Sequence, residues 1–265
     1  MVWYGMVWYG MVWYGMVWGC FLSQKYGIIN NGYCFGSIQD MKYKAFTLAE
    51  ILIVIGIVGV ISAMTIPSLI TECRAIILRV QFQIAWAKVN QVYLKMVAED
   101  ANLTADVAQK DPYYQQYPSL IAKHMVGAHA SSETKSRNGN IQEYFKKLGY
   151  TDMSGNVGSH ILWFIDDGYV ELPNGEIWWI ENGNGQQALT IDINGVQHGP
   201  NKWGYDLFTF IYNVEKGQYV PDTEGACDNI RYLSSGNYNG RSCASKAAKD
   251  PKYFKKLLRH QKVYD

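Results

Sequence analysis

The stretch Lys44-Ala-Phe-Thr-Leu-Ala-Glu-Ile-Leu-Ile-Val-Ile-Gly56 decides how this chain of 265 residues is organised. It opens an apolar run in which Ile51–Ile70 contains twenty residues without a charge. A helix of that length spans ~30 Å, about the hydrocarbon thickness of a bilayer. We therefore expect residues 46–70 to form a transmembrane helix. A buried core helix is the alternative, and twenty residues without a charge argue against it.

The residues before the apolar run set its orientation. Residues 41–45, Met-Lys-Tyr-Lys-Ala, form a short basic leader with lysines at 42 and 44. Cationic flanks stay on the cytoplasmic side of a membrane, so we expect the leader inside and the bulk of the chain outside. Residues 1–40 contain a low-complexity repeat of Met-Val-Trp-Tyr-Gly. We interpret them as sequence ahead of a true start at Met41, or as sequence discarded with the leader.

Glu50 lies at the edge of the apolar run, where a carboxylate is costly and usually has a partner. If the chain is cut between Ala45 and Phe46, a new α-ammonium appears four residues before Glu50. The ammonium of a neighbouring subunit can then neutralise this carboxylate and set the register between subunits. An anchor that never assembles has no need of such a pair.

These residues resemble the N-terminal signal of type IV prepilins and their pseudopilin relatives, and the resemblance covers residues 42–70. That family has a basic leader, a small residue before the cut, Phe after it and Glu as the fifth mature residue. The matching residues here are Lys42, Lys44, Ala45, Phe46 and Glu50. The resemblance implies that a prepilin peptidase cuts at Ala45–Phe46 and that Phe46 is then N-methylated. Gly is the usual residue before the cut, and Ala45 is small enough to replace it.

Pro67 lies inside the predicted helix, at a position where the family often has a proline. There it removes one backbone hydrogen bond and clashes with the preceding turn, so we expect a kink. Residues 71–98 are predicted as an amphipathic continuation of the helix, and Cys73 as a buried small residue. Its apolar stripe is expected at Ile76, Ile77, Val80, Ile84, Val89, Val92 and Met96.

Residues 99–265 are predicted to form an exported α+β domain. Residues 99–140 are a polar connector with one or two short helices, and residues 141–148 form another. Asn174-Gly175 is a strong hairpin signal. Strands are expected at Ile161–Asp166, Tyr169–Leu172, Glu176–Glu181, Leu189–Ile193 and Leu207–Tyr212. The predicted fold resembles a pilin: a long N-terminal helix, its first half transmembrane, packed by its second half on a C-terminal antiparallel sheet.

Cys227 and Cys243 flank a polar loop near the C-terminus. In an oxidising compartment a disulfide between them would stabilise the fold by ~3 kcal/mol, and two free thiols are the alternative. None of the five cysteines forms a C-x-x-C pair, which argues against a zinc or thioredoxin-like site.

Asp192, Asn194, Asn201 and Asp206 lie in one loop, and hard oxygen ligands at such spacing suit Ca²⁺. The major pseudopilins of type II secretion resemble this chain in having a calcium loop after the sheet. The alternative is a turn-rich loop in which these side chains cap their own backbone. No other cofactor is predicted.

The C-terminal segment Lys246–Lys262 is basic, although the net charge of the whole chain is only +1. It is predicted as an amphipathic helix that meets DNA or another anionic surface, or that shows a solvated charged face. Its cations are Lys246, Lys249, Lys252, Lys255, Lys256, Arg259 and Lys262.

The sequence gives little support for catalysis, because its five histidines are scattered and no nucleophile or phosphate-loop motif is present. The resemblance implies a structural subunit of a pilus-like filament, anchored in the bacterial cytoplasmic membrane and then present at the cell surface or in the periplasm. Its partners would be the prepilin peptidase, other pilin subunits, the inner-membrane assembly machinery and membrane lipid. The alternatives are a pseudopilin of a type II secretion or DNA-uptake system, and a monomeric single-pass adhesin.

Overall fold

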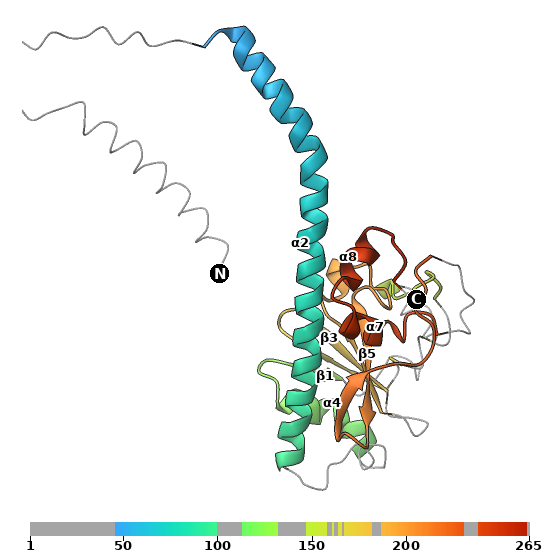
Figure 1. The fold of residues 1–265 in the computed structure, drawn as a ribbon. Coiled ribbons are helices and arrows are strands. Elements are labelled where there is room, and N and C mark those ends of the chain that lie inside the picture. The colour runs from blue at the N-terminus through green and yellow to red at the C-terminus, as the bar shows by residue number, and fades with distance from the viewer. Residues whose placement is uncertain are drawn as a thin grey trace, which may run out of the picture. The chain divides into compact units, whose positions relative to one another are not determined.

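The computed structural model describes residues 46–99, 113–131, 147–157, 161, 164–165, 167–181, 187–230 and 238–263 (Figure 1). The low-complexity segment 1–40 and the leader 41–45, with Ala45, lie outside the described residues. So does most of the helix predicted over 141–148, of which residues 147 and 148 are helical. The chain divides into two compact units, Met1–Val54 and Ile55–Asp265.

Helix α2 extends over Leu48–Glu99, 52 residues, and ends where the sequence predicted. Within the described residues it is the one helix long and apolar enough to cross a membrane, judged by length and composition. The helix continues through Pro67, and Thr71 Oγ1 donates to the Pro67 carbonyl at 2.9 Å. Because Pro67 has no N–H, it cannot donate to the carbonyl of Ala63, and the kink at Pro67 stays a prediction.

The domain buries one face of α2, and the first buried residue on this face is Ala75. The residues buried on this face are Ala75, Leu78, Phe82, Ala85, Val89, Val92, Tyr93 and Met96. The predicted stripe is therefore correct at its end and wrong at its start, because Ile76, Ile77, Val80 and Ile84 are 45–61 % exposed. This half of α2 is apolar on two faces, and periodicity alone did not show which face the sheet covers. Cys73 is exposed, not buried as predicted.

The sheet has six antiparallel strands, and their order in the sheet follows their order in the chain. The strands are β1 His129–Ser131, β2 Tyr169–Glu171, β3 Ile177–Glu181, β4 Ala188–Asp192, β5 Leu207–Asn213 and β6 Gln218–Pro221. Asn174-Gly175 forms the β2–β3 turn, as predicted, and Gly175 has a φ of 86°.

Four of the five predicted strands are present, and the prediction was wrong in three places. The described residues of 161–166 (161, 164 and 165) are not in a strand. β1 and β6 were not predicted, because β1 is only three residues long and β6 ends in a proline. Both are edge strands, where short length and proline are tolerated.

Side chains of alternating strand residues enter two hydrophobic cores. In β3, Trp178 and Ile180 join the core that contains Phe82 and Val89 of α2, whereas Trp179 joins a second core with Tyr150. This is the alternation expected of a strand that is covered on both faces. The first core also receives side chains from α4 (Tyr113–Lys123), α7 (Cys243–Lys249) and α8 (Tyr253–Leu258). The predicted α+β class, a long helix packed on an antiparallel sheet, is confirmed.

The C-terminal segment differs from the single basic helix that the sequence predicted. It forms two short helices, α7 and α8, separated at Asp250-Pro251, because a proline cannot continue the helix before it. The predicted Cys227–Cys243 disulfide is present and ties the start of α7 to the chain after β6. In Figure 1, α8 lies beside α2 at the end of the domain from which residues 55–70 project.

Candidate functional site

The start of α2 contains a reciprocal hydrogen-bond arrangement between Thr47 and Glu50. The Glu50 N–H donates to Thr47 Oγ1 at 3.2 Å, and the Thr47 N–H donates back to Glu50 Oε2 at 2.8 Å. Thr47 Oγ1 also donates to the same Oε2 at 3.0 Å. This is a capping box, in which residues three apart satisfy N–H groups that the helix itself leaves without acceptors.

The capping box gives Glu50 a local role that its place in the apolar run did not suggest. Both donors of Thr47 bond to Oε2, so a further donor can approach Oε1. Phe46, which would become the first mature residue, is 78 % exposed. A capping box accepts glutamine as well as glutamate at this position, so the box itself does not require the charge.

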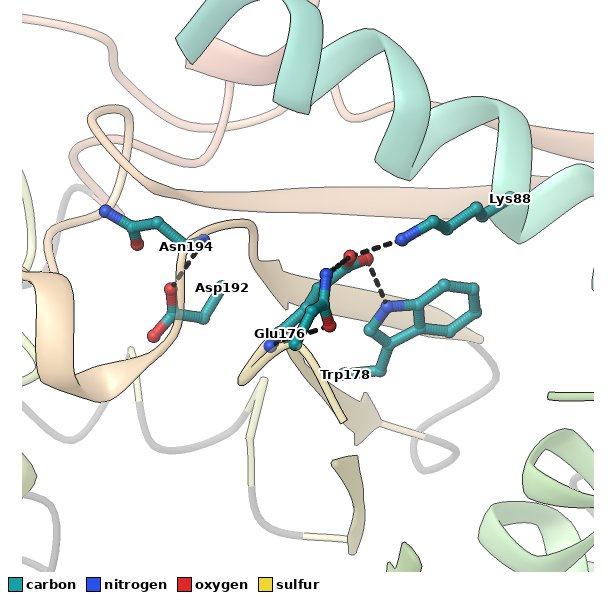
Figure 2. A network of polar contacts seen from close by, with 6 residues as sticks. Lys88, Glu176, Trp178, Asp192 and Asn194 are labelled. Carbon is teal, nitrogen blue, oxygen red and sulfur yellow. Dashed lines mark hydrogen bonds and ion pairs between the residues drawn. The ribbon is translucent and has the colours of Figure 1, made fainter. Parts of the chain in front are cut away.

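A second candidate site begins where β4 ends, at the buried residue Asp192. Its Oδ1 accepts the N–H of Gly195 at 2.8 Å. The same oxygen accepts the N–H of Asn194 at 3.3 Å (Figure 2). Its Oδ2 accepts the Tyr150 hydroxyl at 2.8 Å. Because three donors hold this carboxylate, its orientation in the loop is fixed.

Asp206 closes the same loop and is also buried. Its Oδ2 accepts the N–H of Asn201 at 2.9 Å, and its Oδ1 accepts the N–H of Lys202 at 2.7 Å. The Asn194 side chain also lies within hydrogen-bonding reach of Asp206. The structure therefore brings together all four residues that the sequence singled out, although they are spread over fifteen positions.

The two carboxylates shape the electrostatics of the loop. Burial, together with the charge of Asp206, raises the pKa of Asp192 to about 7. Burial likewise raises the pKa of Asp206. Among the described residues, neither carboxylate has a lysine, arginine or histidine within ion-pair distance. A bound cation would therefore relieve an unfavourable charge arrangement.

Two amide oxygens in the loop fit a cation as well. Among the described residues, Asn194 Oδ1 and Asn201 Oδ1 are buried atoms with no hydrogen-bond partner, which is a costly arrangement for a polar atom. Carboxylate and amide oxygens are hard donors of the kind that Ca²⁺ prefers, so these four residues could hold such an ion. The described residues contain no cluster of three or more His, Cys, Asp or Glu side chains, so the donor set here depends on the asparagines.

The loop rests on the β2–β3 turn, which is in turn fastened to α2. A Cβ on Gly195 would lie 2.2 Å from the Gly175 carbonyl oxygen, so the two backbones are in close contact. Glu176, next to Gly175, receives Lys88 Nζ of α2 at 2.5 Å and Trp178 Nε1 at 2.8 Å (Figure 2). These contacts link α2 to the Asp192 loop through the turn.

Several polar contacts were not predicted because their members are far apart in the sequence. Arg241 forms an ion pair with the buried Asp222 and a second with Glu224, 2.9 Å away. Lys255 and Arg259 of the basic segment pair with Glu72 of α2, at 2.7 and 2.6 Å. The basic segment therefore does not only present a solvated charged face, because two of its cations form ion pairs with α2. The runs of charge were visible in the sequence, but their partners were not.

No curated protein and no solved structure was found to match the chain. One family model does match, that of the prokaryotic N-terminal methylation motif, and the matched residues are 40–66. This segment contains Phe46, the Thr47–Glu50 capping box and most of the uncharged run. The chain therefore carries a prepilin-type N-terminal signal at residues 40–66.

Proposed function

We propose that this chain is a membrane-anchored structural subunit of a type IV pilin-like filament. The observation that carries the proposal is the methylation motif at the start of a 52-residue helix. Residues 51–70 of this helix are exposed apart from the half-buried Ser62, and the residues that the domain buries begin at Ala75. On this proposal a prepilin peptidase cuts at Ala45–Phe46 and methylates Phe46, and α2 holds the chain in the cytoplasmic membrane with the domain outside.

A second apolar face of α2 supports assembly over a monomeric anchor. Ile76, Ile77, Val80 and Ile84 are exposed although they lie beyond the uncharged run that would occupy the membrane. A monomer would leave this face in water, and soluble proteins rarely expose a contiguous apolar patch. Helices of neighbouring subunits would cover it, together with residues 51–70, in a filament core.

The capping box makes a sharp test of assembly feasible. Glu50→Gln keeps a residue that can complete the box but removes the charge that would pair with the α-ammonium of a neighbour. Thr47→Ala removes the cap and keeps the charge. We expect both variants to insert into the membrane and to be cut, and only Glu50→Gln to lose filaments in a shearing assay of the native cell.

Two outcomes of that assay would contradict the proposal. Normal filaments with Glu50→Gln would show that the charge has no role in assembly. If Thr47→Ala lost filaments and Glu50→Gln kept them, Glu50 would have only a local role in capping the helix start. An uncut chain in either variant would show that the change impairs cleavage by the peptidase. N-terminal sequencing of the membrane fraction checks this.

We infer that the Asp192–Asp206 loop binds Ca²⁺. The inference is supported by Asn194 Oδ1 and Asn201 Oδ1, two buried oxygens without partners, beside two buried carboxylates. Asp192, Asn194, Asn201 and Asp206 would hold the ion, which would act structurally by neutralising the loop and joining its two ends. This loop also favours the second candidate function, a pseudopilin of a secretion or DNA-uptake system, because major pseudopilins resemble the chain in this feature.

Calcium binding is tested by thermal unfolding of the full chain in detergent. After removal of divalent cations with a chelator, Ca²⁺ alone is added back. Binding at a hundred times the dissociation constant stabilises the folded state by ~2.7 kcal/mol and raises the melting temperature accordingly. An unchanged melting temperature at millimolar Ca²⁺ would leave the loop as a set of backbone caps.

A further inference from the structure

Helix α8 is fastened to α2 directly beyond the uncharged run. Ile70 is the last residue of that run, and Glu72 follows it by ~3 Å along the helix axis. Glu72 Oε1 accepts both Lys255 Nζ, at 2.7 Å, and Arg259 Nη2, at 2.6 Å. The C-terminal segment therefore meets α2 at the level where the helix would leave the membrane.

The direction of α8 is set by a second contact. Arg79 Nη1 donates to the Pro251 carbonyl at 3.4 Å, just before α8 begins. Arg79 is ~10 Å farther from Ile70 along α2 than Glu72 is. α8 thus runs antiparallel to α2, and its C-terminal end faces the membrane-spanning half (Figure 1).

The cations at this end of the domain form what we call the juxtamembrane basic surface. All are exposed or half-buried, Lys255 and Arg259 pair with Glu72, and Lys256 pairs with Asp250 at 2.8 Å. The chain as a whole has a net charge of only +1, so positive charge is concentrated here. The surface comprises Arg74, Lys252, Lys255, Lys256 and Arg259.

The height of this surface matches the headgroup layer of a bilayer. If Ile51–Ile70 fills the hydrocarbon core, Glu72 and Arg74 lie roughly 3 and 6 Å beyond its edge. The polar layer on each side of a bilayer is roughly 5–8 Å thick. Long lysine and arginine side chains at this height reach lipid phosphates, and each cation near an anionic leaflet adds attraction.

We propose that the juxtamembrane basic surface binds the phosphates of anionic lipid headgroups in the outer leaflet while the subunit is anchored. The proposal rests on the proposed membrane span. Arginine and lysine both bind phosphate through charge-assisted hydrogen bonds, and arginine does so with two parallel donors. The contact would hold the domain against the bilayer before assembly, and it would be lost when the subunit is pulled out of the membrane. DNA is the less favoured occupant because the headgroup layer itself would occupy this height.

The test uses the full chain in lipid nanodiscs made either of phosphatidylcholine alone or with about one third phosphatidylglycerol. Pulse labelling with an amine-reactive reagent, read by mass spectrometry, reports the accessibility of individual lysines. Lys252 and Lys255 should react about fivefold more slowly in the anionic discs, and high salt should remove the difference. Lys216 is the internal control, because it lies next to β6. The Tyr219 N–H of β6 donates to Asn90 of α2 at 2.8 Å, and Asn90 is ~30 Å from Ile70 along the helix axis.

A matched pair of variants tests whether the effect belongs to this surface. Arg74→Gln with Lys252→Gln removes two cations without touching the Glu72 ion pairs, and protection of Lys255 should weaken. Lys95→Gln with Lys216→Gln makes the same change of charge at exposed positions far from the surface and should leave that protection unchanged.

Three results would overturn the inference. They are equal labelling of Lys255 in the two lipid compositions, equal behaviour of the two double variants, and protection of Lys252 and Lys255 by a short DNA duplex but not by anionic lipid. Resistance of the chain to alkaline extraction is measured in the same preparation. Loss of that resistance would contradict the membrane span itself, so failure of the lipid contact and failure of the anchor are distinguishable.

Discussion

Lys88 Nζ on α2 lies 2.5 Å from Glu176 Oε2 at the β2–β3 turn, and this ion pair joins the helix to the sheet. The Glu176 side chain is only 4 % exposed, and that of Lys88 is 31 % exposed. Trp178 Nε1 donates to the other carboxylate oxygen at 2.8 Å. A nearly buried carboxylate is thus held by one charged donor and two neutral ones, Trp178 Nε1 and, at 3.3 Å, Asn174 Nδ2.

We expect Lys88→Met to lower the free energy of unfolding by ~2 kcal/mol, because it leaves the Glu176 charge buried without its cation. Adding Glu176→Gln should recover part of this loss, since a neutral amide can still accept from Trp178. Urea unfolding of the full chain in detergent, followed by tryptophan fluorescence, measures both. Lys95→Met, at an exposed position on the same helix, is the control and should change the value by less than ~0.5 kcal/mol. Equal losses for Lys88→Met and the double variant would contradict this account.

Gly195 is the position where the Asp192–Asp206 loop touches the β2–β3 turn, and alanine should not be tolerated there. Its φ is 82°, and an added Cβ would meet the Gly175 carbonyl oxygen at 2.2 Å. We expect Gly195→Ala to cost ~3 kcal/mol, from backbone strain and overpacking together. Gly217→Ala is matched in its positive φ but has open space around it, so it should cost only ~1 kcal/mol. Equal melting temperatures for the two variants would contradict the close contact.

The proposed calcium site predicts different behaviour for two buried aspartates that both cap backbone N–H groups. Asp192→Asn should reduce the rise in melting temperature that Ca²⁺ produces, because it removes one of the two charges in the loop. Asp152→Asn should preserve that rise in full, because Asp152 accepts the N–H of Asn156 at 2.8 Å in a different turn. Calcium titrations of the two variants, each against its own chelated form, make the comparison. A reduced response in both would indicate a general loss of stability rather than loss of a ligand.

The pKa of Asp192 predicts an unusual dependence of stability on pH. Its folded-state pKa of about 7 lies above its ordinary value of 3.8, so folding favours the protonated acid. Its contribution to stability is present below about pH 4 and is lost as the pH rises through 7. In chelator, the free energy of unfolding of the wild type should therefore fall relative to that of Asp192→Asn between these values. Parallel pH curves for the two proteins would contradict the raised pKa.

The Cys227–Cys243 disulfide joins two residues sixteen positions apart and closes a loop that carries Arg241. Replacing both cysteines by alanine should lower the free energy of unfolding by ~3 kcal/mol, largely because the unfolded chain gains freedom. Chemical denaturation of the double variant measures this loss. Treatment of the wild type with a reductant should reproduce it, whereas the same treatment of the double variant should have no effect. An effect of the reductant on the double variant would point to the remaining cysteines.

Features set by neighbouring residues could be predicted from the sequence, and features set by distant ones could not. The end of α2 and the Asn174-Gly175 turn follow from periodicity and turn chemistry, and both are present. The four candidate calcium ligands fall within one segment, so their spacing was visible, and calcium binding there stays a prediction. The Tyr150–Asp192 and Lys88–Glu176 contacts join residues 42 and 88 positions apart, and no local pattern records them.

The choice of face on α2 shows the same limit in another form. Val80 and Phe82 are both apolar, and the sequence permits either to face the sheet. The ring of Phe82 lies 4.9 Å from that of Phe208 and 5.7 Å from that of Phe210, both in β5. The covered face is therefore selected by aromatic side chains that lie more than a hundred residues later in the sequence.

The sequential order of the six strands bears on how the chain folds as it is exported. An N-terminal anchor delivers residues to the outside in chain order, so each strand after β1 would meet its partner already in place. Pairing between consecutive strands keeps most loop closures short, which favours fast folding and limits the time that an unpaired edge is open to other chains. The last segment to arrive, α7 with α8, completes the disulfide and the Glu72 ion pairs. On the proposed topology, the disulfide and the ion pairs would form only after α7 and α8 have emerged, so a chain stalled before that point would lack both fastenings and would be open to proteolysis.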